Sequence, residues 1–268
     1  MRQFKVLSSK FKATTGLTLI LGSLTMFLFA GKASAELTIK ANHDHITIDF
    51  FYHGSTVSVS GISDPGADII VKIASPDGHE SLRQKGKVGG VLWMNVGSLN
   101  FEDTPKLYFL TDTKKVEDIL SRDEIDKYVI GYNALSKHVK LEPAASEDEK
   151  SKWFDQFVKF KESRNLYYVS HGRVSLTEKD GKQDYYVKLD WPYQAAPGNY
   201  TVTVYAVRDK KVVETASANV LVEQVGVVKS FAGMAKNNAA MYGTISIFAA
   251  LIAGFGVGLI FRKGGGAH

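Results

Sequence analysis

A long uncharged stretch near the C-terminus constrains this chain more than any other feature. No charged residue lies between Lys236 and Arg262, and most residues of 240–261 are apolar or small. About 22 such residues form a helix of about 33 Å, which matches the roughly 30 Å hydrocarbon core of a bilayer. Because a segment in lipid must satisfy its own backbone hydrogen bonds, 240–261 is predicted to cross a membrane as a helix. The basic residues that follow predict a cytoplasmic tail, 262–268, and place the preceding chain on the other side.

The N-terminus has the pattern of an export signal. Basic residues precede the uncharged stretch 13–31, and Ala33 and Ala35 then provide the small residues of a cleavage site before Glu36. The sequence therefore predicts a signal peptide over 1–35 and a mature chain that begins at Glu36. Retention of this segment as a second membrane span is the alternative. We expect the large domain to lie outside the cytoplasm.

The absence of cysteine excludes several kinds of chemistry. With no cysteine in the 268 residues, the chain has no disulfide framework, no thiolate nucleophile and no cysteine-based zinc site. The exported domain must therefore be held together by its own hydrophobic core. The formal net charge is +5, but much of the excess lies in the signal region and in scattered lysines. Nucleic acid is not an expected partner.

Two stretches alternate between apolar and polar residues in the manner of half-buried strands. In 36–112 the alternating runs are separated by turn residues such as Ser63-Asp64-Pro65-Gly66, and in 165–225 by Lys179-Asp180-Gly181-Lys182. Several short strands at close spacing favour immunoglobulin-like sandwiches. We therefore predict a mainly β protein with two β-sandwich lobes. The sequence leaves open whether the lobes form one unit.

The period changes to a helical one between the two lobes and again before the predicted span. Over 113–164 apolar residues recur at helical spacing, and Ser146 followed by Glu149 is a capping-box pattern. We predict a helical connector there, with Trp153, Phe157 and Phe160 on its buried face. An amphipathic pattern over 226–239 predicts a short juxtamembrane helix.

Four motifs occur in this chain in the same order as in a known protein family. They are Phe51-x-x-Gly54-x-x-Val57-x-Val59-x-Gly61; Lys87-x-x-Gly90-x-x-Trp93-Met94-Asn95 with Pro105-x-x-Tyr108; Pro197-Gly198-x-Tyr200; and Tyr242-Gly243 opening a span that ends Phe261-Arg262. The chain resembles a bacterial transmembrane protein family of unknown function that is common in alphaproteobacteria. Genes of that family are often described beside those of a sulfite-exporter-type permease. The resemblance implies a transport-related accessory role and supplies no catalytic residues.

The predicted span carries small residues on one face. Ala250, Gly254 and Gly258 recur every four residues, and Gly243 is a further small residue. Such a face lets two helices approach closely and pack by van der Waals contact. We interpret it as a helix-packing site for an integral membrane partner or for a second copy. The alternative is that glycine and alanine are simply common in spanning helices.

Two clusters of polar residues are candidates for ligand binding. His43 and His45 would share one face of a strand, and His53 could approach from a neighbouring strand to hold zinc or copper. The alternative is a polar strand face at an exposed edge.

Separately, Arg83, Lys85 and Lys87 would line one face of a strand, where they could attract an oxyanion such as sulfite or anionic lipid headgroups. The alternative there is a solvated strand.

Aromatic residues and missing motifs complete the sequence picture. Trp93, Trp153 and Trp191 lie in periodic apolar patterns, which predicts core packing rather than an aromatic cleft. No GxSxG, HExxH or phosphate-binding glycine loop is present. We therefore expect a non-enzymatic accessory or assembly subunit of an integral membrane transporter, without a cofactor. The alternative is a stand-alone, membrane-tethered module that binds a metal or an anion.

Overall fold

The structure is a computed structural model. It describes residues 36–143 and 146–262. The predicted signal peptide and the tail beyond Arg262 lie outside the described residues.

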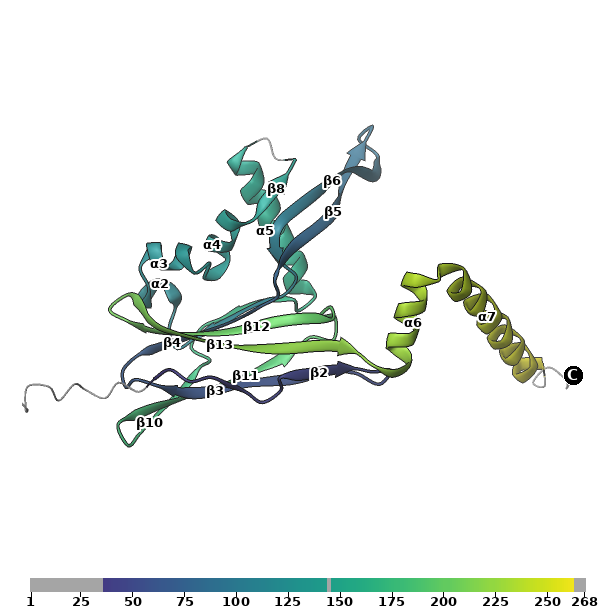
Figure 1. The fold of residues 1–268 in the computed structure, drawn as a ribbon. Helices are drawn as coiled ribbons and strands as arrows, with labels where there is room; N and C mark the ends of the chain where they lie inside the picture. Colours follow the sequence, from purple (N-terminus) through teal and green to yellow (C-terminus); the bar gives the residue numbers. More distant parts are fainter. Residues whose placement is uncertain (1–35, 144–145, 263–268) are drawn as a thin grey trace, which may run out of the picture. The chain divides into compact units, whose positions relative to one another are not determined.

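Alternating strands form three sheets (Figure 1). The first has the order β1 (Lys40–Ala41), β3 (Ser55–Ser63), β11 (Lys182–Trp191) and β10 (Ser175–Lys179). The second has the order β2 (His45–Ile48), β13 (Lys211–Gln224), β12 (Gly198–Arg208), β4 (Asp68–Ala74), β7 (Tyr108–Asp112) and β9 (Tyr167–Ser170). The third joins β5 (Asp77–Val88), β6 (Leu92–Pro105) and β8 (Lys140–Glu142).

Strands from the two predicted lobes pair with one another. In the first sheet β3 lies antiparallel to β11, with Val59 opposite Val187. In the second, β4 lies antiparallel to β12, with Ile73 opposite Val202. Each half of the chain therefore contributes strands to both sheets, and the two lobes are halves of a single sandwich. The mainly β class with a helical connector is as predicted.

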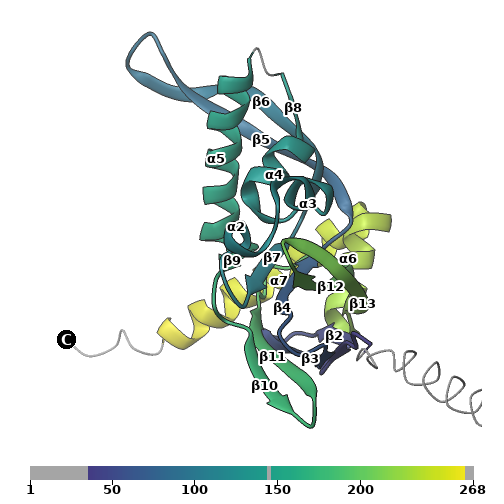
Figure 2. The same ribbon diagram turned by 90° about the vertical axis from the view of Figure 1, so that its left-hand side faces the viewer.

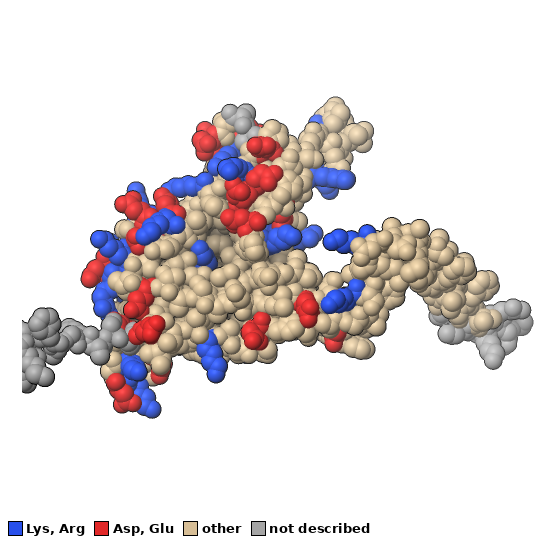
Figure 3. Space-filling model, in the orientation of Figure 1, with Lys and Arg blue, Asp and Glu red and all other residues tan. Residues whose placement is uncertain are grey.

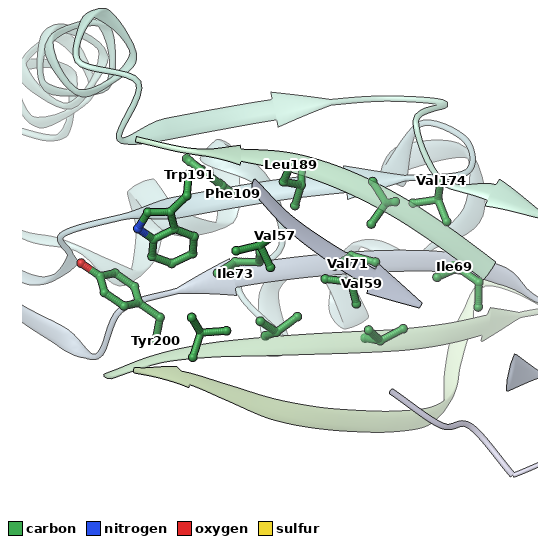
Figure 4. Packing of buried hydrophobic residues seen from close by; sticks show 14 of the residues in the cluster. Val57, Val59, Ile69, Val71, Ile73, Phe109, Val174, Leu189, Trp191 and Tyr200 are labelled. Carbon is green, nitrogen blue, oxygen red and sulfur yellow. The ribbon is translucent and has the colours of Figure 1, made fainter. Parts of the chain in front are cut away.

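The first core fills the space between the two large sheets. Val57 and Val59 of β3 face Ile69, Val71 and other side chains of the second sheet, and all are buried. Figure 4 shows Trp191 and Tyr200 at one end of this core. Their rings meet edge to face at 4.8 Å, an arrangement that aromatic pairs favour.

A helical layer covers the other face of the second sheet (Figures 1 and 2). It contains α2 (Val116–Ile119), α3 (Arg122–Lys127), α4 (Gly131–His138) and α5 (Glu147–Ser163). Together with the base of β5 and β6, these helices enclose a second core that includes Phe101, Tyr108 and Phe157. The rings of Phe101 and Phe157 stack at 4.3 Å. The helical connector predicted over 113–164 thus consists, in the described residues, of three short helices followed by the longer α5.

Helix α5 begins at the predicted cap but turns a slightly different face inward. The Ser146 hydroxyl accepts a hydrogen bond from the Glu149 backbone N–H at 3.2 Å. The buried face carries Phe154, Phe157, Val158 and Lys161, whereas Trp153 and Phe160 are only half-buried. Phe154 and Lys161 are thus buried in place of the predicted Trp153 and Phe160, one residue further along the chain in each case. The prediction missed this face because Lys161, a charged residue, belongs to it.

Two helices follow the sandwich. α6 (Gly226–Asn237) starts after the end of β13, and α7 (Ala239–Arg262) follows after Asn238. Within the described residues, Ala239–Leu259 is the one stretch that is long and apolar enough to cross a membrane. Both elements were expected from the sequence at these positions.

Candidate functional site

The small residues of α7 form a shallow groove along the helix. Ala250, Gly254 and Gly258 line it together with the larger Leu251, Phe255 and Leu259, and its volume is about 470 Å³. Gly243 lies two helical turns before Ala250 and therefore on nearly the same face. The sequence-predicted packing residues thus share one side of the helix, with large apolar side chains beside them.

The three candidate metal ligands do not come together. His43 precedes β2, whereas His45 lies on it and places Nε2 3.0 Å from Glu223 Oε1. The His53 ring contacts the Phe51 carbonyl oxygen instead. Within the part of the chain that the structure describes, no three His, Cys, Asp or Glu residues are grouped as metal ligands. The metal site stays a prediction, without a cluster in the described residues to support it.

The basic row lies on β5, as its spacing indicated. Arg83, Lys85 and Lys87 alternate with less exposed residues and face the same side of the strand. None of them forms an ion pair with another residue in the described ranges. Lys87 places Nζ 5.5 Å from the centre of the Trp93 ring across the hairpin. The row is therefore available to an anionic ligand.

The core position predicted for Trp93 is wrong. Its side chain is 66 % exposed near the tip of the β5–β6 hairpin, whereas Trp191 is buried and Trp153 half-buried. The apolar run around Trp93 resembled a buried strand, but no other element of the described chain covers it. The Gly89-Gly90 pair in the sequence could have indicated that Trp93 lies near a hairpin turn, because both glycines have positive φ there.

A cleft of about 600 Å³ lies beside the end of the sandwich that contains Trp191. The sequence did not reveal it, because its lining comes from distant segments. Aromatic side chains such as Phe109, Tyr168 and Tyr193 line it together with Arg173 and Lys188. The indole Nε1 of Trp191 is buried without a hydrogen-bond partner among the described residues. Glu162 and Asp190 line it as well, so the cleft carries charges of both signs and its lining does not single out an anionic ligand.

Asp112 is a buried acid that sequence analysis missed. Its side chain is inaccessible to solvent and accepts hydrogen bonds from His171 Nδ1 at 2.7 Å and from the Gly172 backbone N–H at 3.2 Å. Burial raises the pKa of Asp112, and the hydrogen bond from His171 opposes that rise. Asp112 thereby fixes the connection after β9 and does not line the cleft.

Fold and surface together define a class of protein: a β-sandwich with a helical layer, joined to one helix that can span a membrane. Comparison with known families is more specific. The family model described as Putative transmembrane protein (Alph_Pro_TM) matches residues 36–263. The chain belongs to this family. No curated protein matches its sequence.

Proposed function

We propose that this protein is a non-catalytic accessory or assembly subunit of an integral membrane transporter. Helix α7 holds it in the bacterial inner membrane, the sandwich lies in the periplasm, and the C-terminus lies in the cytoplasm. The basic residues that end the span support this orientation through the positive-inside rule. The association of the family with a sulfite-exporter-type permease supports such a permease as the partner.

The groove along α7 is the observation that carries the proposal. Lipid tails are as apolar as leucine side chains, so helices in a bilayer associate through close packing rather than through hydrophobic burial. Gly254 and Gly258 let a partner helix approach the α7 backbone, while Phe255 and Leu259 provide edges against which it can pack. A lone anchor would need no such face.

Replacement of the glycines tests the proposal. Full-length protein carrying Gly254→Leu and Gly258→Leu is purified in mild detergent beside the wild type, and co-purifying polytopic proteins are quantified by mass spectrometry. We expect a stoichiometric transporter with the wild type and its loss with the double variant, because two leucines would fill the groove.

Ile252→Leu provides the matched control, since this residue lies on the opposite side of α7 and is exposed. That variant should retain the partner. A complex that survives both glycine replacements would rule out packing through this face. Recovery of the wild-type protein alone, or only with a second copy of itself, would count against a transporter partner.

A further inference from the structure

The β5–β6 hairpin ends in an exposed apolar tip. Val91, Leu92, Trp93 and Met94 are each at least half exposed, at 81, 66, 66 and 52 %. The first buried residue on β6 is Leu99, so the tip extends about 26 Å beyond it at roughly 3.3 Å per residue. Exposed apolar clusters of this kind mark surfaces that bind a partner or a membrane.

The hairpin has two chemically different faces. Val88 lies opposite Leu92, and Gly86 lies opposite Met94, so these residues share one face. A β-carbon on Gly86 would lie within 3.0 Å of the Val96 methyl groups, which places Val96 on the same face. The other face carries Lys85 and Lys87, with Trp93 opposite Lys87. Figure 3 shows the tip as an uncharged surface with basic side chains beside it.

Strand directions place the hairpin at the end of the sandwich where the membrane anchor begins. Both β4 and β13 are antiparallel to β12, so they run in the same direction. β4 ends at Ala74 and leads directly into β5, while β13 ends at Gln224 and leads directly into α6. Hairpin and anchor therefore leave the sandwich from the same end.

Further exposed aromatic residues gather at this end. β2 runs parallel to β13, and the loop after β2 exposes Phe50 and Phe51, each at 75 %. Their rings meet at 5.3 Å, edge to face. Tyr193, in the connection from β11 to β12, is also exposed. Together with the β5–β6 hairpin, these two segments present aromatic side chains at the anchor end.

We propose that the β5–β6 hairpin docks on the bilayer that holds α7, with Leu92 and Met94 in the acyl boundary and Lys85 and Lys87 at anionic headgroups. Apolar residues bounded by tryptophan and lysine suit the membrane interface, where rings sit at headgroup level and lysines extend toward phosphate. Phe50, Phe51 and Tyr193 form the second contact of the same surface.

The charge pattern and the tether both favour lipid over a soluble partner. Arg83, Lys85 and Lys87 form no ion pairs with described residues, so their charge is available to an anionic leaflet. Because α7 keeps the domain beside a bilayer, the hairpin meets the membrane surface at a high effective concentration, as a binding module does when it is linked to its target. A weakly amphipathic hairpin is then sufficient to contact the membrane.

Single cysteines allow a sharp test, because the chain has no cysteine of its own. Full-length Leu92→Cys protein carries an environment-sensitive fluorophore and is reconstituted in bilayers of phosphatidylethanolamine and phosphatidylglycerol. Quenching by a lipid-attached quencher is compared with quenching by iodide in the water. We expect strong lipid quenching and weak iodide quenching, since an interfacial group inserts about 5–10 Å into the headgroup and acyl boundary.

Two controls give the comparison its meaning. Thr177→Cys lies on the β10–β11 hairpin at the opposite end of the sandwich and should respond only to iodide. Replacing both Lys85 and Lys87 by Gln in the labelled Leu92→Cys protein should lower the docking equilibrium constant by roughly fivefold for each lysine near an anionic surface. In bilayers of phosphatidylcholine alone, the proteins with and without these lysines should dock equally.

Two outcomes would overturn the proposal. If the label at residue 92 responds to iodide as fully as the label at 177, the tip lies in water. If the label at 92 is shielded from both quenchers, a protein surface covers it. Val91→Cys gives a second reading of the tip, and neither tip replacement touches a core residue. The test is independent of the α7 groove, because it needs no partner protein.

Discussion

Lys161 of α5 and Glu80 of β5 form a short ion pair, with 2.5 Å between Nζ and Oε1. The Lys161 side chain is only 2 % exposed and also donates a hydrogen bond to the Lys106 carbonyl oxygen at 3.0 Å. Its ammonium lies over the rings of Phe157 and Tyr167. Burial lowers the pKa of Lys161, and Glu80 opposes this effect. The pair fastens α5 to the base of the hairpin.

Removal of Glu80 should be the more damaging way to break this pair. Glu80→Gln leaves the Lys161 ammonium buried without a countercharge, which typically costs about 3–5 kcal/mol. Lys161→Met keeps the apolar stem against the rings, and Glu80 is 23 % exposed and can be hydrated. We therefore expect a smaller loss for Lys161→Met. Urea unfolding of each variant measures the free energies.

Lys159→Met is the matched control, because Lys159 lies on the exposed side of the same helix. It should change the free energy of unfolding by less than about 0.5 kcal/mol. Equal losses for Glu80→Gln and Lys161→Met would contradict the argument that the unpaired buried charge dominates.

Gly61 marks a close backbone crossing that admits no side chain. A β-carbon there would lie 1.9 Å from the Thr38 carbonyl oxygen and 2.5 Å from the Tyr185 hydroxyl. That hydroxyl donates a hydrogen bond to the same Thr38 oxygen. Gly61→Ala should therefore force the segments apart and cost about 1–3 kcal/mol, as overpacking does.

Gly78→Ala provides the comparison, because the nearest atom to its added carbon would be the Thr104 carbonyl oxygen at 3.8 Å. Thermal unfolding of both variants measures the difference. A Gly61→Ala protein as stable as Gly78→Ala would show that the crossing relaxes without cost.

Local patterns in the sequence predicted the elements well. The alternation of Val57 and Val59 identified β3, and the Ser146–Glu149 pattern identified the start of α5, because both depend on residues close in the chain. The uncharged stretch identified α7 for the same reason. Each of these signals lies within one element and needs no knowledge of its neighbours.

Pairing between distant strands could not be predicted in this way. Nothing in the alternation of β3 specifies that Val59 lies opposite Val187, so the sequence predicted two lobes and left open whether they form one unit. The exposure of Trp93 depends on which elements fail to cover it, and the cleft depends on which segments meet. The partner choice of the α7 groove remains a prediction, because it depends on a second molecule.

The N-terminal half of the sandwich should not fold alone. A fragment of residues 36–112 contains β3 and β4 but lacks β11 and β12, their antiparallel partners. Val57 and Ile73 would then lie exposed instead of in the shared core. We expect no cooperative urea transition for this fragment and a cooperative one for 36–225, measured by circular dichroism.

Mixing 36–112 with 113–225 tests whether the missing strands are the cause. Recovery of a cooperative transition on mixing is the expected result. A fragment 36–112 that unfolds cooperatively without its complement would instead establish an independent N-terminal lobe.

Lys72 should make stability depend on pH. Burial beneath the helical layer lowers the pKa of Lys72 to about 8, and the negative charge of Asp77 opposes this effect. Its Nζ donates a hydrogen bond to the Tyr128 carbonyl oxygen at 2.6 Å and lies 5.5 Å from the centre of the Tyr205 ring. The folded protein therefore releases this proton at a lower pH than the unfolded chain does.

The sign follows from which state binds the proton. Between about pH 8 and the ordinary lysine pKa of about 10.4, the unfolded chain holds the proton and the folded protein does not, so stability rises with pH by up to about 1.4 kcal/mol per unit. Lys72→Met should lose this rise, and the difference in unfolding free energy between wild type and variant should grow from pH 8 to 10. Lys179→Met, which removes an exposed lysine of β10, controls for the loss of one positive charge. A wild-type minus Lys72→Met difference that stays constant over this range would mean that Lys72 is hydrated in the folded protein.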